Sequence, residues 1–154
     1  MNMSKVPVAA VIGHPVNHSR SPRMHNYWLA QFGLEGYYIP LDIDPKKFER
    51  SIRNLPELGF VGANITIPYK EKVLKIADKI SDRAALVGAA NTLTFLQNGG
   101  IYADNTDGYG FLQNIKSKYK DWSASEGISV VFGAGGASRA ILGALIEDGA
   151  SDII

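Results

Sequence analysis

Residues 128–140 read ISVVFGAGGASRA, and this stretch decides the fold class. Its apolar start predicts a strand over 128–132, its glycines predict a tight turn over 133–138, and a helix is expected over 139–148. Glycines in such a turn let a pyrophosphate approach the backbone amides at the helix N-terminus, which carries a partial positive charge. The order of strand, turn and helix therefore favours a dinucleotide-binding unit over a turn that only joins two elements.

Strands and helices also alternate through the rest of the chain. The expected strands cover residues 6–12, 37–43, 60–65, 91–96 and 101–103, and a further strand is expected to begin at 152–154. Helices are expected to begin at Ser21-Pro22, Asp44-Pro45 and Pro68, and to cover residues 82–87 and 108–119. This alternation predicts an α/β fold in which a mainly parallel open sheet is followed by the first βα unit of a Rossmann-like domain.

The polar stretch 118–127, KYKDWSASEG, is the expected domain boundary. We expect a first domain over residues 1–102, an interdomain helix and linker over 103–127, and the start of a dinucleotide-binding domain over 128–154. One βαβ unit cannot form a doubly wound sheet, so the second domain is expected to be incomplete.

Composition excludes several classes of protein. The chain carries 16 basic and 15 acidic side chains without a long run of one sign, so no nucleic acid or anionic membrane partner is expected. It has no cysteine, and His14, His18 and His25 lack a carboxylate cluster, so no disulfide and no metal site is expected. Residues 1–7 lack a signal-peptide core, and no segment approaches the roughly 20 apolar residues of a membrane span, which predicts a cytoplasmic protein.

A polar loop follows the first expected strand and reads GHPVNHSRSPRMHN over residues 13–26. Ser19 and Ser21 lie in this loop, at the strand end where open α/β sheets bind ligands. Two hydroxyls beside a helix N-terminus can hold a carboxylate. The alternative is that Ser21, which precedes Pro22, is an ordinary helix cap.

Two further segments carry groups suited to acid/base chemistry. Asn64 and Thr66 share one side of a strand end, and Lys70 is expected in the first turn of the helix after Pro68. Lys70 is either an acid/base group or a solvated lysine. In the segment DNTDG, Asp107 is either a helix cap or a carboxylate facing Lys70, in which case the pair can pass a proton to a substrate oxygen.

Taken together, these segments resemble the shikimate dehydrogenase family. The matching pieces, in chain order, are GHPVNHSRSPRMHN, GANITIPYK, GAANT, DNTDG and GAGGASRA, and they cover most of residues 13–140. The resemblance implies that the first domain binds a ring acid, that the second binds NADP, and that the active site lies in the cleft between them. The implied reaction is the reversible, NADPH-dependent reduction of 3-dehydroshikimate to shikimate in chorismate and aromatic amino-acid biosynthesis.

The same resemblance implies a role for each site residue. Lys70 would exchange a proton with the C3 oxygen, and Asp107 would orient Lys70 and a substrate hydroxyl. The implied substrate contacts are Ser19 and Ser21 for the carboxylate, and Thr66, Lys70, Asn91 and Asp107 for the ring hydroxyls. The implied cofactor contacts are Gly133, Ala134, Gly135, Gly136 and Ala137 for the pyrophosphate, with Asp82 as a further acidic contact.

Two alternatives stay open. One is a quinate/shikimate dehydrogenase that uses NAD or NADP, because the residues that select the cofactor are expected beyond Ile154. The other is a non-catalytic metabolite-binding module, although the presence of both Lys70 and Asp107 argues against it. The 154-residue chain alone is expected to have little or no dehydrogenase activity, and a homodimer is neither required nor excluded.

Overall fold

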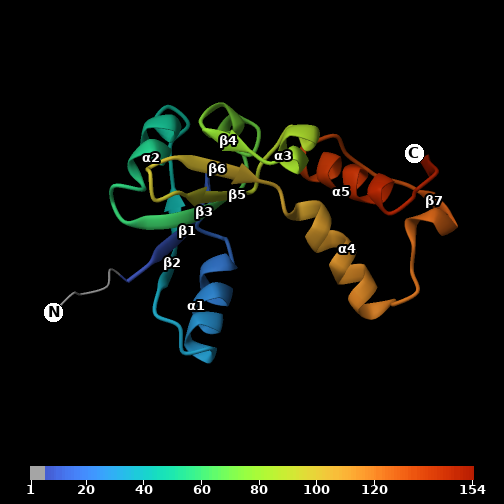
Figure 1. Ribbon diagram of the computed structural model, residues 1–154, viewed down its shortest axis with the longest axis horizontal. Helices are drawn as coiled ribbons and strands as arrows, with labels where there is room; N and C mark the ends of the chain where they lie inside the picture. The colour runs from blue at the N-terminus through green and yellow to red at the C-terminus, as the bar shows by residue number, and fades with distance from the viewer. Residues whose placement is uncertain (1–5) are drawn as a thin grey trace.

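The computed structural model describes residues 6–154 and contains one six-stranded and one two-stranded sheet (Figure 1). The strands are β1 (Val8–Gly13), β2 (Tyr37–Asp42), β3 (Phe60–Ile65), β4 (Lys79–Ile80), β5 (Thr92–Phe95), β6 (Ile101–Asp104), β7 (Ile128–Ser129) and β8 (Asp152–Ile153). The α-helices are α1 (Ser21–Gln31), α2 (Phe48–Asn54), α3 (Asp82–Val87), α4 (Asp107–Lys118) and α5 (Gly136–Glu147). Two 3₁₀ helices, η1 (Lys72–Lys75) and η2 (Ala124–Glu126), complete the described elements.

The larger sheet has the strand order β2-β1-β3-β5-β6-β4. Strand β1 runs parallel to β2 and β3, and β4 runs parallel to β6, whereas β5 is antiparallel to both of its neighbours. Three of the five pairings are thus parallel, which confirms the predicted α/β class with a mainly parallel sheet. The expected hairpin of β5 and β6 is present, but β4 was not predicted because a two-residue strand has no periodicity to detect.

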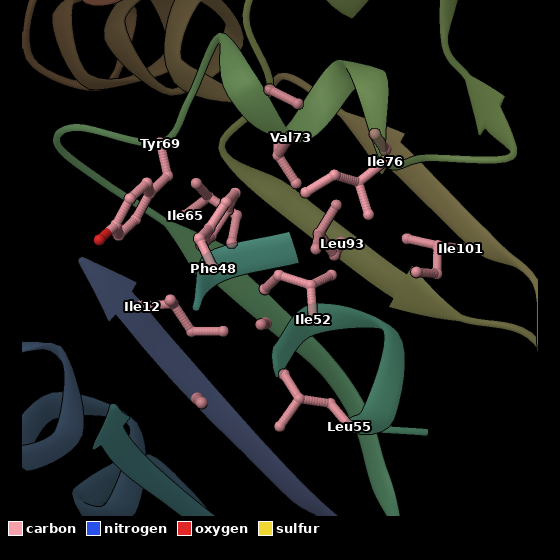
Figure 2. Packing of buried hydrophobic residues seen from close by; sticks show 14 of the residues in the cluster. Ile12, Phe48, Ile52, Leu55, Ile65, Tyr69, Val73, Ile76, Leu93 and Ile101 are labelled. Carbon is pink, nitrogen blue, oxygen red and sulfur yellow. The ribbon is translucent and has the colours of Figure 1, made fainter. Parts of the chain in front are cut away.

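Helices cover both faces of this sheet, with α1 on one side and α2 on the other (Figure 1). Alternate residues of β1 separate the two faces, since Ile12 belongs to the large core cluster and Val11 packs with Tyr38 on the α1 side. Figure 2 shows the large cluster, where side chains of α2 and of the segment around η1 meet those of β1, β3 and β5. Ile52 is fully buried there, and complete burial of such a side chain contributes about 1.5–3 kcal/mol.

The second sheet belongs to a βαβ unit in which β7 and β8 are parallel and α5 connects them. Helix α5 packs against α4 so closely that a Cβ at Gly108 would lie 2.5 Å from the Ala140 carbonyl oxygen. Ala140 also packs with Val87 and Ala89, at the end of α3 and just beyond it. The βαβ unit is therefore attached to the first sheet through α3 and α4.

Four local predictions were wrong. The helix expected to begin at Asp44-Pro45 begins at Phe48, because residues 45–47 form a turn in which the Lys47 N–H donates to the Asp44 carbonyl at 2.9 Å. Pro68 does not open an α-helix, because the chain turns at residues 67–68 and 70–71 before η1, and the Lys70 carbonyl accepts a hydrogen bond from the distant Ala90 N–H at 2.7 Å. Ser21 is the first residue of α1 and not its cap. Asp107 is likewise the first residue of α4, and Thr106 takes the cap position without a side-chain hydrogen bond.

Two further observations concern helices. Helix α5 begins at Gly136, three residues earlier than expected, because Gly136, Ala137 and Ser138 are helical and the extended Gly135 takes the cap position. Among residues 6–154, none of the helices has the length and apolar character needed to cross a membrane.

Candidate active site

An ion pair joins two segments that are 37 residues apart in the chain. Lys70 Nζ donates to Asp107 Oδ2 at 2.6 Å, and the two side chains are 20% and 27% exposed. Lys70 lies in the turn after β3, and Asp107 begins α4. The predicted contact is therefore present. Because an ammonium group has three N–H donors, two remain for a ligand.

Asn91 holds the Asp107 carboxylate from the other side. Its Nδ2 donates to Asp107 Oδ1 at 2.8 Å and to Thr106 Oγ1 at 3.0 Å, while its Oδ1 accepts the Thr106 N–H at 2.9 Å. Each carboxylate oxygen of Asp107 thus has its own donor, Lys70 on one side and Asn91 on the other. The carboxylate cannot rotate without breaking a charge-assisted hydrogen bond, so it presents a fixed acceptor surface.

Asn105 explains why the segments GAANT and DNTDG meet. It is 3% exposed, its Nδ2 donates to the Ala89 carbonyl at 2.8 Å, and its Oδ1 accepts the Asp107 N–H at 3.0 Å. A buried amide bonded on both sides is costly to replace, because an unmade hydrogen bond costs about 1–3 kcal/mol. Sequence reasoning quoted Asn105 within its motif but gave it no role.

The glycine turn lies against the lysine stem. A Cβ at Gly136 would lie 3.1 Å from Ala89 Cβ and 3.9 Å from Lys70 Cβ, so a larger residue there would press on both. Arg139 of α5 also forms an ion pair with Glu71, the residue after Lys70. No side chain caps the N-terminus of α5, so the first backbone N–H groups of this helix are available to bind a ligand.

Two positions in the turn need glycine or leave room for a ligand. Gly133 has φ +119, a conformation that other residues rarely adopt. A Cβ at Gly135 would have nothing within 4 Å, so the backbone there is open to approach. These features fit a pyrophosphate at the N-terminus of α5.

The serine loop, residues 14–21, joins β1 to α1. Ser19 Oγ accepts a hydrogen bond from the Ser21 N–H at 3.3 Å, and both residues are half-buried. The loop begins beside the next strand end, because a Cβ at Gly13 would lie 2.6 Å from Thr66 Cγ2. Within the described residues, neither serine hydroxyl bonds to the Lys70–Asp107 pair, so the two groups do not form one hydrogen-bond network.

Asp42 anchors this serine loop to β2. Its Oδ1 pairs with His14 Nδ1 at 2.6 Å, and its Oδ2 accepts the Val16 N–H at 3.2 Å. The hydrogen bond from His14 lowers the pKa of Asp42 from its ordinary value, with a further contribution from the Val16 N–H. The charged carboxylate is thus the favoured form, and it is the form that holds both partners.

Asn64 belongs to the hydrogen-bond network of Asn91 and Asp107, although the sequence did not place it among the predicted site residues. Its Nδ2 donates to the Asn91 carbonyl at 3.3 Å and to Thr92 Oγ1 at 3.4 Å. The available signal was its period-two relation to Thr66, which places both side chains on one face of β3.

Asp82 stands apart from the other predicted residues. It is exposed at the start of α3, where the Ser81 hydroxyl caps the helix by accepting the Ala84 N–H at 3.1 Å. A cavity of about 90 Å³ lies between α3, α4 and α5, and no predicted site residue lines it. Over residues 6–154, no group of three His, Asp or Glu residues could hold a metal ion.

Comparison with known families decides the relationship. Residues 11–93, more than half of the chain, match the family described as the shikimate dehydrogenase substrate binding domain. The chain belongs to this family. The matched range includes the serine loop, Lys70 and Asn91, whereas Asp107 and the glycine turn lie after it.

Relatives in the shikimate dehydrogenase family extend the likeness to the whole chain. The shikimate dehydrogenase (NADP(+)) of Roseobacter denitrificans is 53% identical over all 154 residues, which make up 56% of that protein. A crystal structure of the Thermus thermophilus enzyme with NADP(H) and shikimate has a TM-score of 0.86 and 37% identity, over 95% of this chain and 54% of that one. A crystal structure of the Listeria monocytogenes enzyme with shikimate and NAD has a TM-score of 0.88 and 30% identity, over 99% of this chain and 52% of that one. The chain spans about half the length of these relatives.

Proposed function

We propose that this chain supplies the substrate site and the pyrophosphate-binding turn of a cytoplasmic, NADP-dependent shikimate dehydrogenase. The reaction is the reversible reduction of 3-dehydroshikimate to shikimate, a step of chorismate and aromatic amino-acid biosynthesis. The observation that carries the proposal is the 2.6 Å contact between Lys70 and Asp107, next to the glycine turn at Gly136. Curated relatives at about 50% identity carry this enzyme's name, which supports the proposed chemistry.

In the proposed mechanism Lys70 is the acid/base group. As the C3 carbonyl carbon is reduced, the Lys70 ammonium donates its proton to the C3 oxygen, and in the reverse direction the amine accepts the hydroxyl proton. Asp107 keeps the ammonium in place and accepts a hydrogen bond from a substrate hydroxyl. Bound NADPH supplies the hydride. The residues that would hold its pyrophosphate are Gly133, Ala134, Gly135, Gly136 and Ala137, and Asp82 is the proposed acidic contact to the cofactor.

The polar groups at the strand ends hold the ring acid in this proposal. Ser19 and Ser21 bind its carboxylate, and the side chains of Thr66 and Asn91 bind ring hydroxyls together with Lys70 and Asp107. A substrate lacking one hydroxyl would leave a partner unpaired, at about 1–3 kcal/mol each, which gives selectivity. The corresponding division is a substrate domain over residues 1–102, a linker over 103–127 and a cofactor domain from 128 onward.

Two assays test the proposal. Shikimate titrated into the 154-residue chain should bind, as measured by calorimetry, whereas the chain alone should show little or no turnover. A chimera that joins this chain to the C-terminal part of the Roseobacter denitrificans enzyme should oxidise shikimate with NADP. In that chimera Lys70→Ala should lower kcat by roughly 10²–10⁴-fold, the usual contribution of a positioned acid/base group.

Lys75→Ala is the matched control, because Lys75 is an exposed lysine of η1. Equal rates for Lys70→Ala and the parent chimera would contradict the proposed role. A chimera that binds shikimate but has no turnover, beside an active Roseobacter enzyme, would favour a binding module instead.

Use of NAD is a second candidate, favoured by the Listeria monocytogenes structure that holds shikimate and NAD. Turnover of shikimate and of quinate with each cofactor would distinguish the two. This comparison has to be made on the native full-length protein, since the chimera's C-terminal part would bring its own cofactor preference.

A further inference from the structure

Tyr38 is held in place by the HN dipeptide of α1, a motif that the proposed chemistry leaves unused. The Asn26 side chain donates to the Tyr38 carbonyl at 2.8 Å and accepts the Tyr38 N–H at 2.9 Å, so it acts as a strand neighbour on the edge of β2. His25 stacks on the Tyr38 ring, with centroids 4.1 Å apart and planes 12° from parallel. Tyr38 is only 6% exposed. Asn26 thus holds the Tyr38 backbone, and His25 holds the face of the Tyr38 ring.

The hydroxyl of this ring reaches across β1 to the site. Tyr38 Oη donates to Asn64 Oδ1 at 2.6 Å, the shortest of the three hydrogen bonds made by the Asn64 side chain. Burial raises the pKa of Tyr38 to about 12, so the hydroxyl keeps its proton at neutral pH. It therefore remains a donor.

A fixed donor on Oδ1 decides which way the Asn64 amide faces. With Oδ1 toward Tyr38, Nδ2 points to the Asn91 carbonyl and Thr92 Oγ1. A flipped amide would place two carbonyl oxygens, those of Asn64 and Asn91, against each other and would leave the Tyr38 hydroxyl without an acceptor. Both changes are unfavourable.

The orientation matters because the same face of the sheet is open to a ligand. A groove over it is lined by Tyr38, Asn64 and Thr92. Asn91 connects Asn64, through its carbonyl, to Asp107, through its side chain. A ring hydroxyl bound between Asn64 and Asp107 would replace Thr92 Oγ1, whose 3.4 Å bond is the longest of the three, as acceptor for one Asn64 N–H, and would donate to the Asp107 carboxylate on its other side. Such a hydroxyl can satisfy both at once.

We propose that Tyr38, itself fixed by His25 and Asn26, is a positioning residue that acts on the ring acid only through the Asn64 amide. The inference rests on the proposed function for the identity of the ligand. It assigns the aromatic and amide residues of α1 and β2 a part in binding without a contact to substrate.

The test is a double-mutant cycle in the 154-residue chain, with shikimate affinity measured by calorimetry. Tyr38→Phe keeps the ring and its stacking but removes the donor, and should weaken binding about tenfold, or 1.4 kcal/mol. Tyr37→Phe, at the exposed neighbouring position, is the control and should change affinity less than about twofold. In an Asn64→Ala background, Tyr38→Phe should have no further effect.

Two outcomes of this cycle would overturn the proposal. One is an unchanged affinity in Tyr38→Phe, and the other is the same loss with and without Asn64, which would indicate a general structural role. As a control, thermal unfolding of each variant checks that it is folded before its affinity is compared.

A second readout does not depend on any ligand. The side-chain ¹H–¹⁵N resonances of Asn64 should shift strongly in Tyr38→Phe and remain in place in Tyr37→Phe. Unchanged Asn64 resonances in Tyr38→Phe would refute the proposal. If the unmodified chain does not bind shikimate, the proposed function fails on this chain, while these resonances still decide whether Tyr38 orients Asn64.

Discussion

The six-stranded sheet and the βαβ unit after it both alternate strands with helices, but they differ in how far their apolar side chains are buried. The first has a cluster of fully buried side chains on one face, including Ile12, Ile52 and Tyr69. In the second, Ile128 of β7 is 65% exposed, and Phe132, which lies between β7 and the glycine turn, is 93% exposed. The first region thus carries its own core, whereas the second depends on packing against α3 and α4. The Lys70–Asp107 pair lies where the two regions meet.

The largest difference between the regions should appear on truncating an apolar side chain in each. Ile52→Ala should lower the free energy of unfolding by about 2–5 kcal/mol, because it opens a cavity in a closed core. Phe132→Ala should change it by less than about 0.5 kcal/mol, because that ring is exposed. Urea unfolding of the 154-residue chain measures both. Equal losses would show that the second region has a core of its own.

A smaller effect is expected where α4 and α5 cross. Gly108→Ala would place a methyl group 2.5 Å from the Ala140 carbonyl oxygen, and the resulting separation of the helices should cost about 1–3 kcal/mol. Gly110→Ala on the same helix meets nothing within 4 Å and should stabilise by about 0.5–1 kcal/mol.

Hydrogen exchange locates the effect of this pair of variants. In Gly108→Ala, the amides of α5 should lose protection while those of β1 and β3 keep it. Loss of protection throughout both sheets would mean that the regions unfold as one unit and would break the comparison.

The smallest effect concerns pH. Burial alone would raise the pKa of Asp104, but hydrogen bonds from Ser81 Oγ and the Asn105 N–H, with the charge of Arg83, hold it below its ordinary value. Because the folded-state pKa is the lower one, this carboxylate stabilises the fold at neutral pH, and the stabilisation is lost as the pH falls below about 4.

Urea unfolding between about pH 7 and pH 3 tests this, and the loss of stability should be smaller in Asp104→Asn than in the unmodified chain. Asp148→Asn is the matching variant in the second region, where a hydrogen bond from Lys116 lowers the pKa of Asp148. An identical pH dependence with and without the Asp104 carboxylate would contradict the assignment.

The sequence predicted features that are encoded locally. Apolar runs located seven of the eight strands, and the motifs GANITIPYK and DNTDG placed Lys70 and Asp107 after strands of one sheet. The contact between Lys70 and Asp107 could be given as one of two alternatives, because both residues lie next to strands of the same sheet. The expected α/β class and the family were confirmed by the fold and by the match over residues 11–93.

What could not be predicted depends on contacts between distant segments. The helix expected after Pro68 is replaced by a turn because the Lys70 carbonyl bonds to Ala90, twenty positions along the chain. The roles of Asn105 and of Tyr38 come from single long-range hydrogen bonds, which leave no periodicity in the sequence. The structure brings Lys70, Asn91 and Asp107 together, and the roles of all the site residues stay proposals.

The central claim is that a ring acid binds beside the Lys70–Asp107 pair, facing the glycine turn. It is tested most directly by titrating shikimate into the ¹⁵N-labelled 154-residue chain and following its amide resonances. The account predicts the largest shifts at Lys70, Asp107 and the Asn91 side chain, with smaller ones at Gly136. Shifts confined to residues around the cavity between α3, α4 and α5, such as Tyr109 and Gly143, or no shifts at saturating shikimate, would contradict it.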